Sequence, residues 1–183
     1  MKFGLIPVIL LMLLVCSIPF AFAEDDDFTY GKPMRGSMHR ISGGAHIHDN
    51  LPGVIDVPLE KHDLSYRLMY EYHEGVGYWQ MGASWTPSPD DERFEYVVTP
   101  EFNLILKDRI YRLGTGIMKS RVKTDDESFW TVMYWQVIAG IGIPLGDRFE
   151  LGIFGHYVFK NWRHVTETDK AAIEGSALLS VSF

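Results

Sequence analysis

Hydrophobic and polar residues alternate along most of the chain from residue 64 onward. In residues 64–74, the hydrophobic residues Leu64, Tyr66 and Leu68 alternate with Ser65 and Arg67. A period of two residues is typical of a β-strand with one apolar face. Seven segments have strand-like composition, rich in Tyr, Trp, Val, Ile and Phe: 64–74, 78–86, 94–106, 110–122, 129–145, 149–162 and 175–183. None of them shows a convincing helical period, so the pattern predicts an all-β protein.

The connections between these segments alternate in length and composition. Short turns occur at 75–77, 107–109 and 146–148, whereas the connections at 87–93, 124–128 and 163–174 are polar and mostly longer. In an up-and-down meander, alternate connections lie at the same end of the sheet. One end would therefore carry the short turns and the other the loops, which is the asymmetry of bacterial outer-membrane barrels.

The two faces of each predicted strand indicate what surrounds the barrel. In residues 94–106 an apolar face that includes Phe102 and Leu104 opposes a polar face that includes Glu101 and Asn103. A lipid-facing barrel places the apolar band outside and the charges inside. A soluble sandwich or a lipocalin-like barrel, with the charged face in water, is the alternative. The signal sequence described below, the connections and the aromatic content together favour the membrane barrel.

The number of strands follows from the direction of the last one. If residues 175–183 run toward the short-turn end, a closed barrel with both termini there needs one more strand before residue 64. We place it at residues 33–48, with 49–63 as the first outer loop. The prediction is an eight-stranded antiparallel up-and-down transmembrane β-barrel. Side chains fill so small an interior, so an open pore is disfavoured. Charged residues of the lumen then have to pair with one another: Arg67, Glu71, Glu101 and Lys160.

The first 23 residues have the layout of a cleaved secretory signal. Lys2 precedes an apolar run, and Ala21-Phe22-Ala23 forms an A-x-A site directly before acidic residues. Lipid attachment at Cys16 is the alternative, although Val15 stands where such sites have a small residue. Cleavage leaves residues 24–183 as the barrel, without cysteine and with 16 Lys and Arg against 24 Asp and Glu, a formal charge of −8. This acidity argues against nucleic acid as a partner.

The C-terminal residues "ALLSVSF" place apolar residues at alternate positions and end in Phe183. This ending resembles the C-terminal signal of bacterial outer-membrane proteins. The resemblance implies that the barrel assembly machinery recognises the last strand. It also implies location in the outer membrane, with outer-membrane lipid and lipopolysaccharide as neighbours.

Residues 100–183 resemble the lipid A 3-O-deacylases, which are small outer-membrane acyl hydrolases with a Ser-His-Glu type of site. The segment "ELGIFGHYVF" places His156 and Tyr157 where the family has a His-Tyr-Ser motif, and Glu174 precedes the last strand as the family's acid does. The resemblance implies His156 and Glu174 as catalytic residues. The chain departs from the family at the nucleophile, because Val158 stands in place of the serine. The hydrolase is therefore the alternative function, intact or degenerate.

The segment around residues 34–49 contains several side chains that can bind metal. They are Met34, Met38, His39, His46, His48 and Asp49, and His46 and His48 share one strand face. Copper or zinc is conceivable, but no fixed spacing motif is present, so a solvated strand end or tail is preferred. We predict no cofactor and no metal. The preferred function is an outer-membrane barrel with a structural or surface-interaction role, with a binder of small ligands or metal held in reserve.

Overall fold

A computed structural model describes residues 38–183 apart from 50, 56, 88, 90–92 and 168–170. The predicted signal peptide and the first residues of the predicted strand at 33–48 lie outside the described residues. The described part contains ten β-strands and one short 3₁₀ helix, Trp162–His164. The strands are β1 His39–Ile47, β2 Leu64–Glu74, β3 Gly77–Thr86, β4 Phe94–Asp108, β5 Tyr111–Met118, β6 Arg121–Thr124, β7 Ser128–Trp130, β8 Tyr134–Pro144, β9 Phe149–Phe159 and β10 Ala171–Ser182. Within these residues, no helix is long and apolar enough to cross a membrane.

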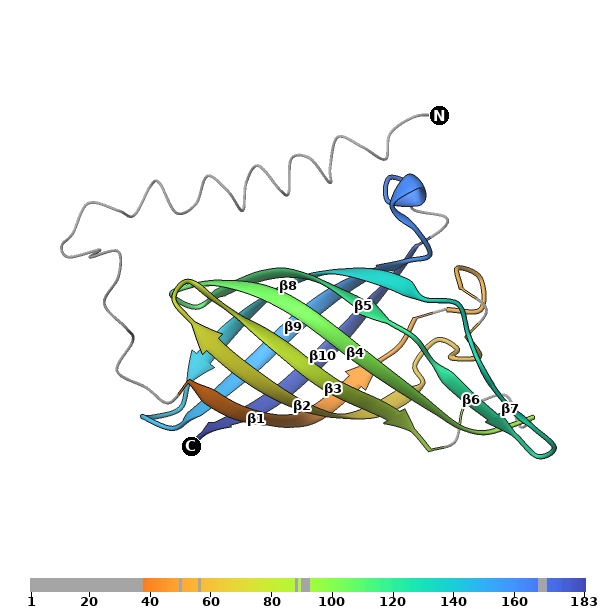
Figure 1. Ribbon diagram of the computed structural model, residues 1–183, viewed down its shortest axis with the longest axis horizontal. Coiled ribbons are helices and arrows are strands. Elements are labelled where there is room, and N and C mark those ends of the chain that lie inside the picture. Colours follow the sequence, from red (N-terminus) through yellow and green to blue (C-terminus); the bar gives the residue numbers. More distant parts are fainter. Residues whose placement is uncertain (1–37, 50, 56, 88, 90–92, 168–170) are drawn as a thin grey trace.

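The strands close into an eight-stranded antiparallel barrel, which confirms the predicted fold class (Figure 1). β5 and β6 together count as one barrel strand, because both pair with β4. β7 and β8 together count as another, because β7 pairs with β6 and β8 pairs with β5. The last strand returns to the first, with β1 and β10 paired from Arg40–Ser182 to Ile47–Gly175. Hydrocarbon cannot hydrogen-bond an open sheet edge, so this closure is what a membrane-spanning sheet requires.

One predicted strand, residues 110–122, is divided at Lys119 and Ser120. The break lies opposite Pro100 of β4, which has no N–H to donate to a neighbouring strand. The backbone N–H of Lys119 donates to the Pro100 carbonyl, and Ser120 is held instead by Thr131, whose backbone N–H donates to the Ser120 carbonyl. The predicted strand 129–145 is divided at the same level, between Trp130 and Tyr134.

The outer face of the barrel is apolar, whereas the lumen is mostly polar and also holds an apolar cluster: Met69, Tyr78, Ile105, Ile138, Phe154 and Leu178. On the outer face Leu68 is 64% exposed and Leu106 is 62% exposed, whereas the lumen residues Ser42 and Asn103 are 0% exposed. This is the reverse of a soluble protein, and it is the distribution expected where hydrocarbon surrounds the barrel. The predicted alternation of faces in 64–74 and around Thr99, Glu101 and Asn103 is confirmed.

Two sequence predictions near the last connection are wrong. Lys160 was expected in the lumen, but β9 ends at Phe159 and Lys160 is exposed in the connection that follows. The last strand begins at Ala171 rather than Gly175, so Glu174 is a strand residue and not a loop residue. The alternation of Ala172, Glu174 and Ser176 on the buried face continues the strand pattern into the predicted loop.

The first outer loop covers the loop end of the lumen. Its two ends are joined by backbone hydrogen bonds from His48 N–H to the Asp63 carbonyl and from His62 N–H to the His48 carbonyl. Four of its aliphatic side chains are each 1% exposed: Leu51, Ile55, Val57 and Leu59. They pack on apolar residues at the ends of the strands, among them Val97, Val122 and Val158. A short apolar layer therefore lies over the polar lumen.

The seam between β1 and β10 should depend on Gly44. A Cβ at Gly44 would lie 1.9 Å from the Ala177 carbonyl oxygen, whereas a Cβ at Gly43 would lie 3.9 Å from its nearest neighbour, the Arg67 carbonyl oxygen. We expect Gly44→Ala to destabilise the barrel by about 1–3 kcal/mol, because the two strands must separate. Gly43→Ala is the matched control. Heat-modifiable gel migration and urea unfolding in detergent measure the difference, and equal stability of the two variants would contradict it.

Candidate functional site

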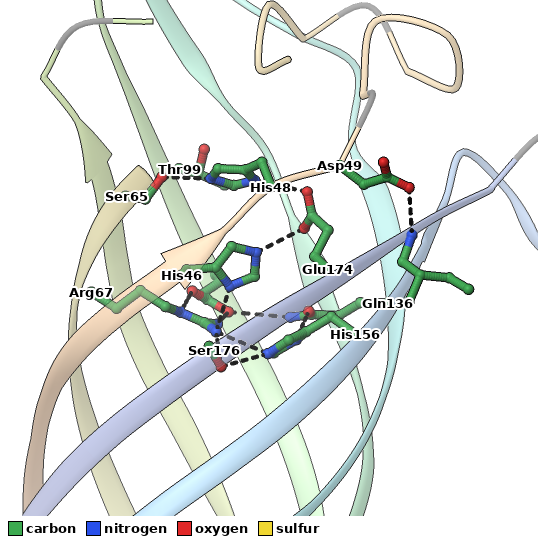
Figure 2. Close-up of polar contacts among 12 residues, drawn as sticks. His46, His48, Asp49, Ser65, Arg67, Thr99, Gln136, His156, Glu174 and Ser176 are labelled. Carbon is green, nitrogen blue, oxygen red and sulfur yellow. Dashed lines mark hydrogen bonds and ion pairs between the residues drawn. The ribbon is translucent and has the colours of Figure 1, made fainter. Parts of the chain in front are cut away.

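Many of the buried polar side chains of the lumen belong to one hydrogen-bonded network. Its centre is Arg67 of β2, which is 4% exposed. The alternation of β2 points Ser65, Arg67 and Glu71 toward the lumen. Figure 2 shows residues from strands distant in sequence, such as His156 and Ser176, around Arg67. Since a buried charge has to be paired, the contacts of Arg67 organise the residues around it.

Arg67 forms a two-point ion pair with Glu101 of β4. Its Nε donates to Glu101 Oε1 at 2.9 Å, and its Nη2 donates to Glu101 Oε2. The same carboxylate also accepts hydrogen bonds from the amides of Asn103 and Gln136, at 3.0 and 3.1 Å. This confirms the expectation that lumen charges pair, with Arg67 and Glu101 as partners. The network continues through Gln80 to Glu71, which also bonds Ser42 and His73.

Arg67 also determines which nitrogens of two histidines carry protons. Its Nη1 lies 3.0 Å from His46 Nδ1 and 3.1 Å from His156 Nε2. Because a guanidinium can only donate, both ring nitrogens must accept. In the neutral rings the other nitrogen then carries the proton, so His46 Nε2–H donates to Glu174 and His156 Nδ1–H donates to Gln136. This assignment of tautomers follows from the hydrogen-bond partners.

Glu174 joins two histidines of the N-terminal strand. His46 Nε2 lies 2.8 Å from its Oε2, and His48 Nδ1 lies 2.7 Å from its Oε1. All three residues are buried, at 3%, 7% and 4% exposed for His46, His48 and Glu174. With Glu174 ionised, the Nδ1–H of neutral His48 donates to the carboxylate, and His48 Nε2 is left as an acceptor.

The acceptor nitrogen of His48 is occupied by a serine. Ser65 Oγ lies 2.5 Å from His48 Nε2 and 2.5 Å from Thr86 Oγ1. Since Ser65 has one proton, which His48 Nε2 accepts, the Thr86 hydroxyl donates to Ser65 Oγ. The contacts thus run in one direction, from Thr86 to Ser65, to His48 and to Glu174. Figure 2 shows His48 between Ser65 and Glu174.

Three of these residues could also be considered as metal ligands. Ligand atoms of His46, His48 and Glu174 all lie within 4.8 Å of one another. Two histidines and a carboxylate suit zinc. The Arg67 contact opposes this use, because a metal on His46 Nε2 would require a proton on Nδ1, directly facing the Arg67 N–H at 3.0 Å. The described hydrogen bonds are satisfied without an ion, so a metal is the weaker interpretation.

The residues predicted as catalytic lie in this network, but they do not bond each other. His156 and Glu174 are cross-strand neighbours in β9 and β10, yet among the described contacts His156 bonds Gln136, Ser176 and Arg67. Val158, where the resembling family has its nucleophile, is 0% exposed in the apolar layer at the loop end.

Sequence reasoning missed Ser65 and Ser176 as members of the site. Both could have been placed on the lumen face by alternation, since Ser65 is two residues from Arg67 and Ser176 is two residues from Glu174. Their partners could not have been found, because His48 is 126 residues from Glu174 and meets it only through the closed barrel.

A second charged cluster lies near the short-turn end. Glu150 of β9 bonds Arg40 at 3.1 Å and Arg112 at 2.8 Å, with Lys107 Nζ at 3.9 Å. Three cations therefore share one carboxylate, and the Nε atoms of Arg40 and Arg112 are buried without a hydrogen-bond partner among the described residues. The lumen therefore holds two groups of paired charge, this cluster and the Arg67 network, together with an apolar cluster that includes Met69, Ile105 and Phe154.

Removing one partner of the central ion pair should cost more than removing both. We expect Arg67→Leu to lower the free energy of unfolding by about 3–5 kcal/mol, because Glu101 is left buried without its cation. The double variant Arg67→Leu, Glu101→Leu should recover a large part of that loss. Urea unfolding in lipid vesicles, followed by tryptophan fluorescence, measures both. Glu101→Leu is measured alone as well. If the double variant loses as much free energy of unfolding as the two single variants lose together, the pairing is contradicted.

Comparison with known proteins supports the fold. No family model matches the sequence, and no curated protein sequence matches it. The solved structure of Neisserial surface protein A (NspA) is similar, with a TM-score of 0.53 and 11% identity over 81% of this chain and 99% of that one. The N-terminal β-barrel domain of Pseudomonas aeruginosa OprF is similar too, with a TM-score of 0.52 and 8% identity over 81% of this chain and 100% of that one. At such low identity the likeness concerns the fold alone.

Proposed function

We propose that the chain is an integral outer-membrane β-barrel with a structural or surface-interaction role and a lumen that does not conduct. The observation that carries this is the filling of the lumen. Side chains from β1, β2, β4, β8, β9 and β10 hydrogen-bond across its centre, and the apolar side chains of the loop at 49–63 cover one end. Small barrels of eight strands are filled in this way, in contrast to wide porins.

The loop end offers the surface for contacts outside the membrane. The hairpin of β6 and β7 extends beyond the rest of the barrel in Figure 1. It carries the exposed aromatic residues Phe129 and Trp130, and Lys119 and Arg121 lie 5.6 and 6.0 Å from the Trp130 ring centroid. An aromatic surface bordered by cations suits contact with anionic groups of lipopolysaccharide.

The exposed last strand supports assembly by the barrel machinery and a lipid environment. Ile173 and Leu179 of β10 are 71% and 49% exposed, and the terminal Phe183 is 64% exposed. β10 is paired with β1 and β9 along its two edges, and its outward side chains form part of the apolar band that a membrane barrel presents to lipid. Outer-membrane lipid, lipopolysaccharide and the assembly machinery are accordingly the proposed partners, and nucleic acid is not.

The lipid A 3-O-deacylase-like hydrolase based on His156 and Glu174 ranks second. These two side chains share no described hydrogen bond, and Val158 offers no nucleophile. If this alternative held, mass spectrometry of lipid A from cells that produce the chain would show loss of one 3-hydroxyacyl group, and His156→Ala would restore the full profile. We expect an unchanged lipid A profile in both cases.

The filled lumen predicts that the reconstituted barrel does not conduct ions. In planar bilayers at 1 M KCl we expect no stepwise conductance, because hydrogen-bonded side chains cross the lumen at several levels. A porin of known conductance in the same bilayers serves as the positive control. Regular conductance steps from the wild-type chain would contradict the proposed function.

A further inference from the structure

We propose that the short-turn end of the lumen binds an oxyanion, such as a phosphate group. Arg40 of β1, Lys107 of β4 and Arg112 of β5 meet there around a single carboxylate, that of Glu150 in β9. Donors therefore outnumber acceptors at this level of the lumen, and a buried charge without a partner is costly. An oxyanion brings negative charge and several acceptor oxygens to the same place.

The described hydrogen bonds leave donors of these cations unused. The Nε atoms of Arg40 and Arg112 are buried without a hydrogen-bond partner among the described residues. Lys107 Nζ lies 3.9 Å from Glu150 Oε2, which is beyond hydrogen-bond distance. Glu150 alone therefore does not satisfy the three side chains that surround it.

Two other carboxylates near this end are not paired with the cluster. Glu71 lies deeper on the lumen face of β2, and its oxygens accept hydrogen bonds from Ser42, Gln80 and His73. The described ion pairs include none between the C-terminal carboxylate of Phe183 and a cation of the cluster. Three positive charges thus meet one negative charge directly, which is the charge balance of a site for an anion.

The backbone holds Arg112 in place without an anion. Its Nη1 donates to the backbone carbonyls of Arg109 and Tyr111, at 2.9 and 3.0 Å. Its Nη2 donates to Glu150 Oε1 at 2.8 Å. Gly142 of β8 makes room for this pair, because a Cβ there would lie 2.4 Å from both Arg112 Nη2 and Glu150 Oε1. A site that is arranged before its ligand arrives loses less entropy on binding.

A cavity gives access to the cluster from the short-turn end. The side chains of Arg40 and Lys107 are 18% and 11% exposed. A cavity of about 430 Å³ is lined, among the described residues, by Asp147, Arg148, Ser182 and Phe183. It lies beside Arg40, because Ser182 is paired with Arg40 and its N–H donates to the Arg148 carbonyl at 2.8 Å. Figure 1 shows the C-terminus at this end, near the start of β1.

An oxyanion can therefore approach Arg40 and Lys107 from solution, and the loop at 49–63, at the opposite end of the lumen, need not move. Short turns of outer-membrane barrels face the periplasm. In the outer membrane, the anion would accordingly come from the periplasmic side.

Titration with inorganic phosphate tests the site. The full chain, folded in detergent without phospholipid, is titrated by isothermal titration calorimetry with sodium phosphate and with sodium chloride at equal ionic strength. We expect saturable binding of phosphate and a rise in the midpoint of urea unfolding that chloride does not produce, because a ligand that binds only the folded state stabilises it. Equal effects of the two salts would mean screening of charge alone and would exclude a soluble anion.

Two variants with opposite expected effects identify the residues. Lys107→Met removes a donor, and we expect it to raise the Kd for phosphate about 10-fold or more, the range for loss of a hydrogen bond to a charged group. Glu150→Gln keeps an acceptor for Arg112 but removes the negative charge, and we expect it to lower the Kd. Lys61→Met is the matched control, because it removes an exposed cation at the loop end and should leave the Kd unchanged.

Heat-modifiable migration confirms that each variant is folded, and Lys107→Met decides the question if Glu150→Gln does not fold. A Kd that Lys107→Met leaves unchanged, or that Glu150→Gln raises, would overturn the assignment of the site to this cluster.

A second experiment distinguishes a soluble anion from the phosphate of a lipid headgroup. The parent protein and Lys107→Met are unfolded with urea in phosphatidylcholine vesicles with and without phosphatidylglycerol. Stabilisation by inorganic phosphate in detergent identifies a soluble anion. Stabilisation by phosphatidylglycerol alone, lost in Lys107→Met, identifies a headgroup. If neither phosphate nor phosphatidylglycerol stabilises the parent protein, the proposal is overturned. The conductance result bears on the proposed barrel role and not on this site.

Discussion

Arg67 carries five N–H donors into the lumen of an eight-stranded barrel, and its buried charge has to be paired and hydrogen-bonded there. Two donors go to Glu101, and Nη1 faces acceptors on His46, His156 and Ser176. Unpaired, this cation would cost several kcal/mol in a low-dielectric interior. The identities of the residues around it follow from that requirement, since each must offer an acceptor toward the centre of the lumen.

The same requirement explains why the barrel has to close where it does. The contacts of Arg67 come from β1, β4, β9 and β10, and those with His156 and Ser176 of β9 and β10 depend on the pairing of the first and last strands. Gly44 allows the backbones of β1 and β10 to approach at that seam. Closure therefore satisfies the sheet edges in the hydrocarbon and the buried charge in the lumen at once. Opening the seam between β1 and β10 would weaken the hydrogen bonds of Arg67 with β9 and β10, and loss of those hydrogen bonds would weaken the seam.

Local patterns predicted most of the strands, because alternation is a property of neighbouring residues. The strand at 64–74 matches β2 at both ends. Errors arose where the local pattern was misleading. Pro100 of β4 interrupts the hydrogen bonds of the neighbouring strand, which therefore divides into β5 and β6. Lys160 continues the alternating pattern of β9 in the sequence, although the strand ends at Phe159. The lumen face of Ser65 and Glu174 was readable from alternation, but their partners were not. The pairing of His48 with Glu174 depends on the register between β1 and β10, which is set by closure of the whole barrel.

The direction of the hydrogen bonds distinguishes the possible uses of the histidine pair. Geometry alone, with three ligand atoms within 4.8 Å, would equally suit a metal ion. The guanidinium breaks this ambiguity, because it can never accept a hydrogen bond, and it therefore fixes the proton of His46 on the nitrogen that faces Glu174. Glu174 then accepts from His46 on one oxygen and from His48 on the other, and His48 Nε2 accepts from the Ser65 hydroxyl. The buried charge of Arg67 thus determines the direction of hydrogen bonds as far away as the one between Ser65 and His48.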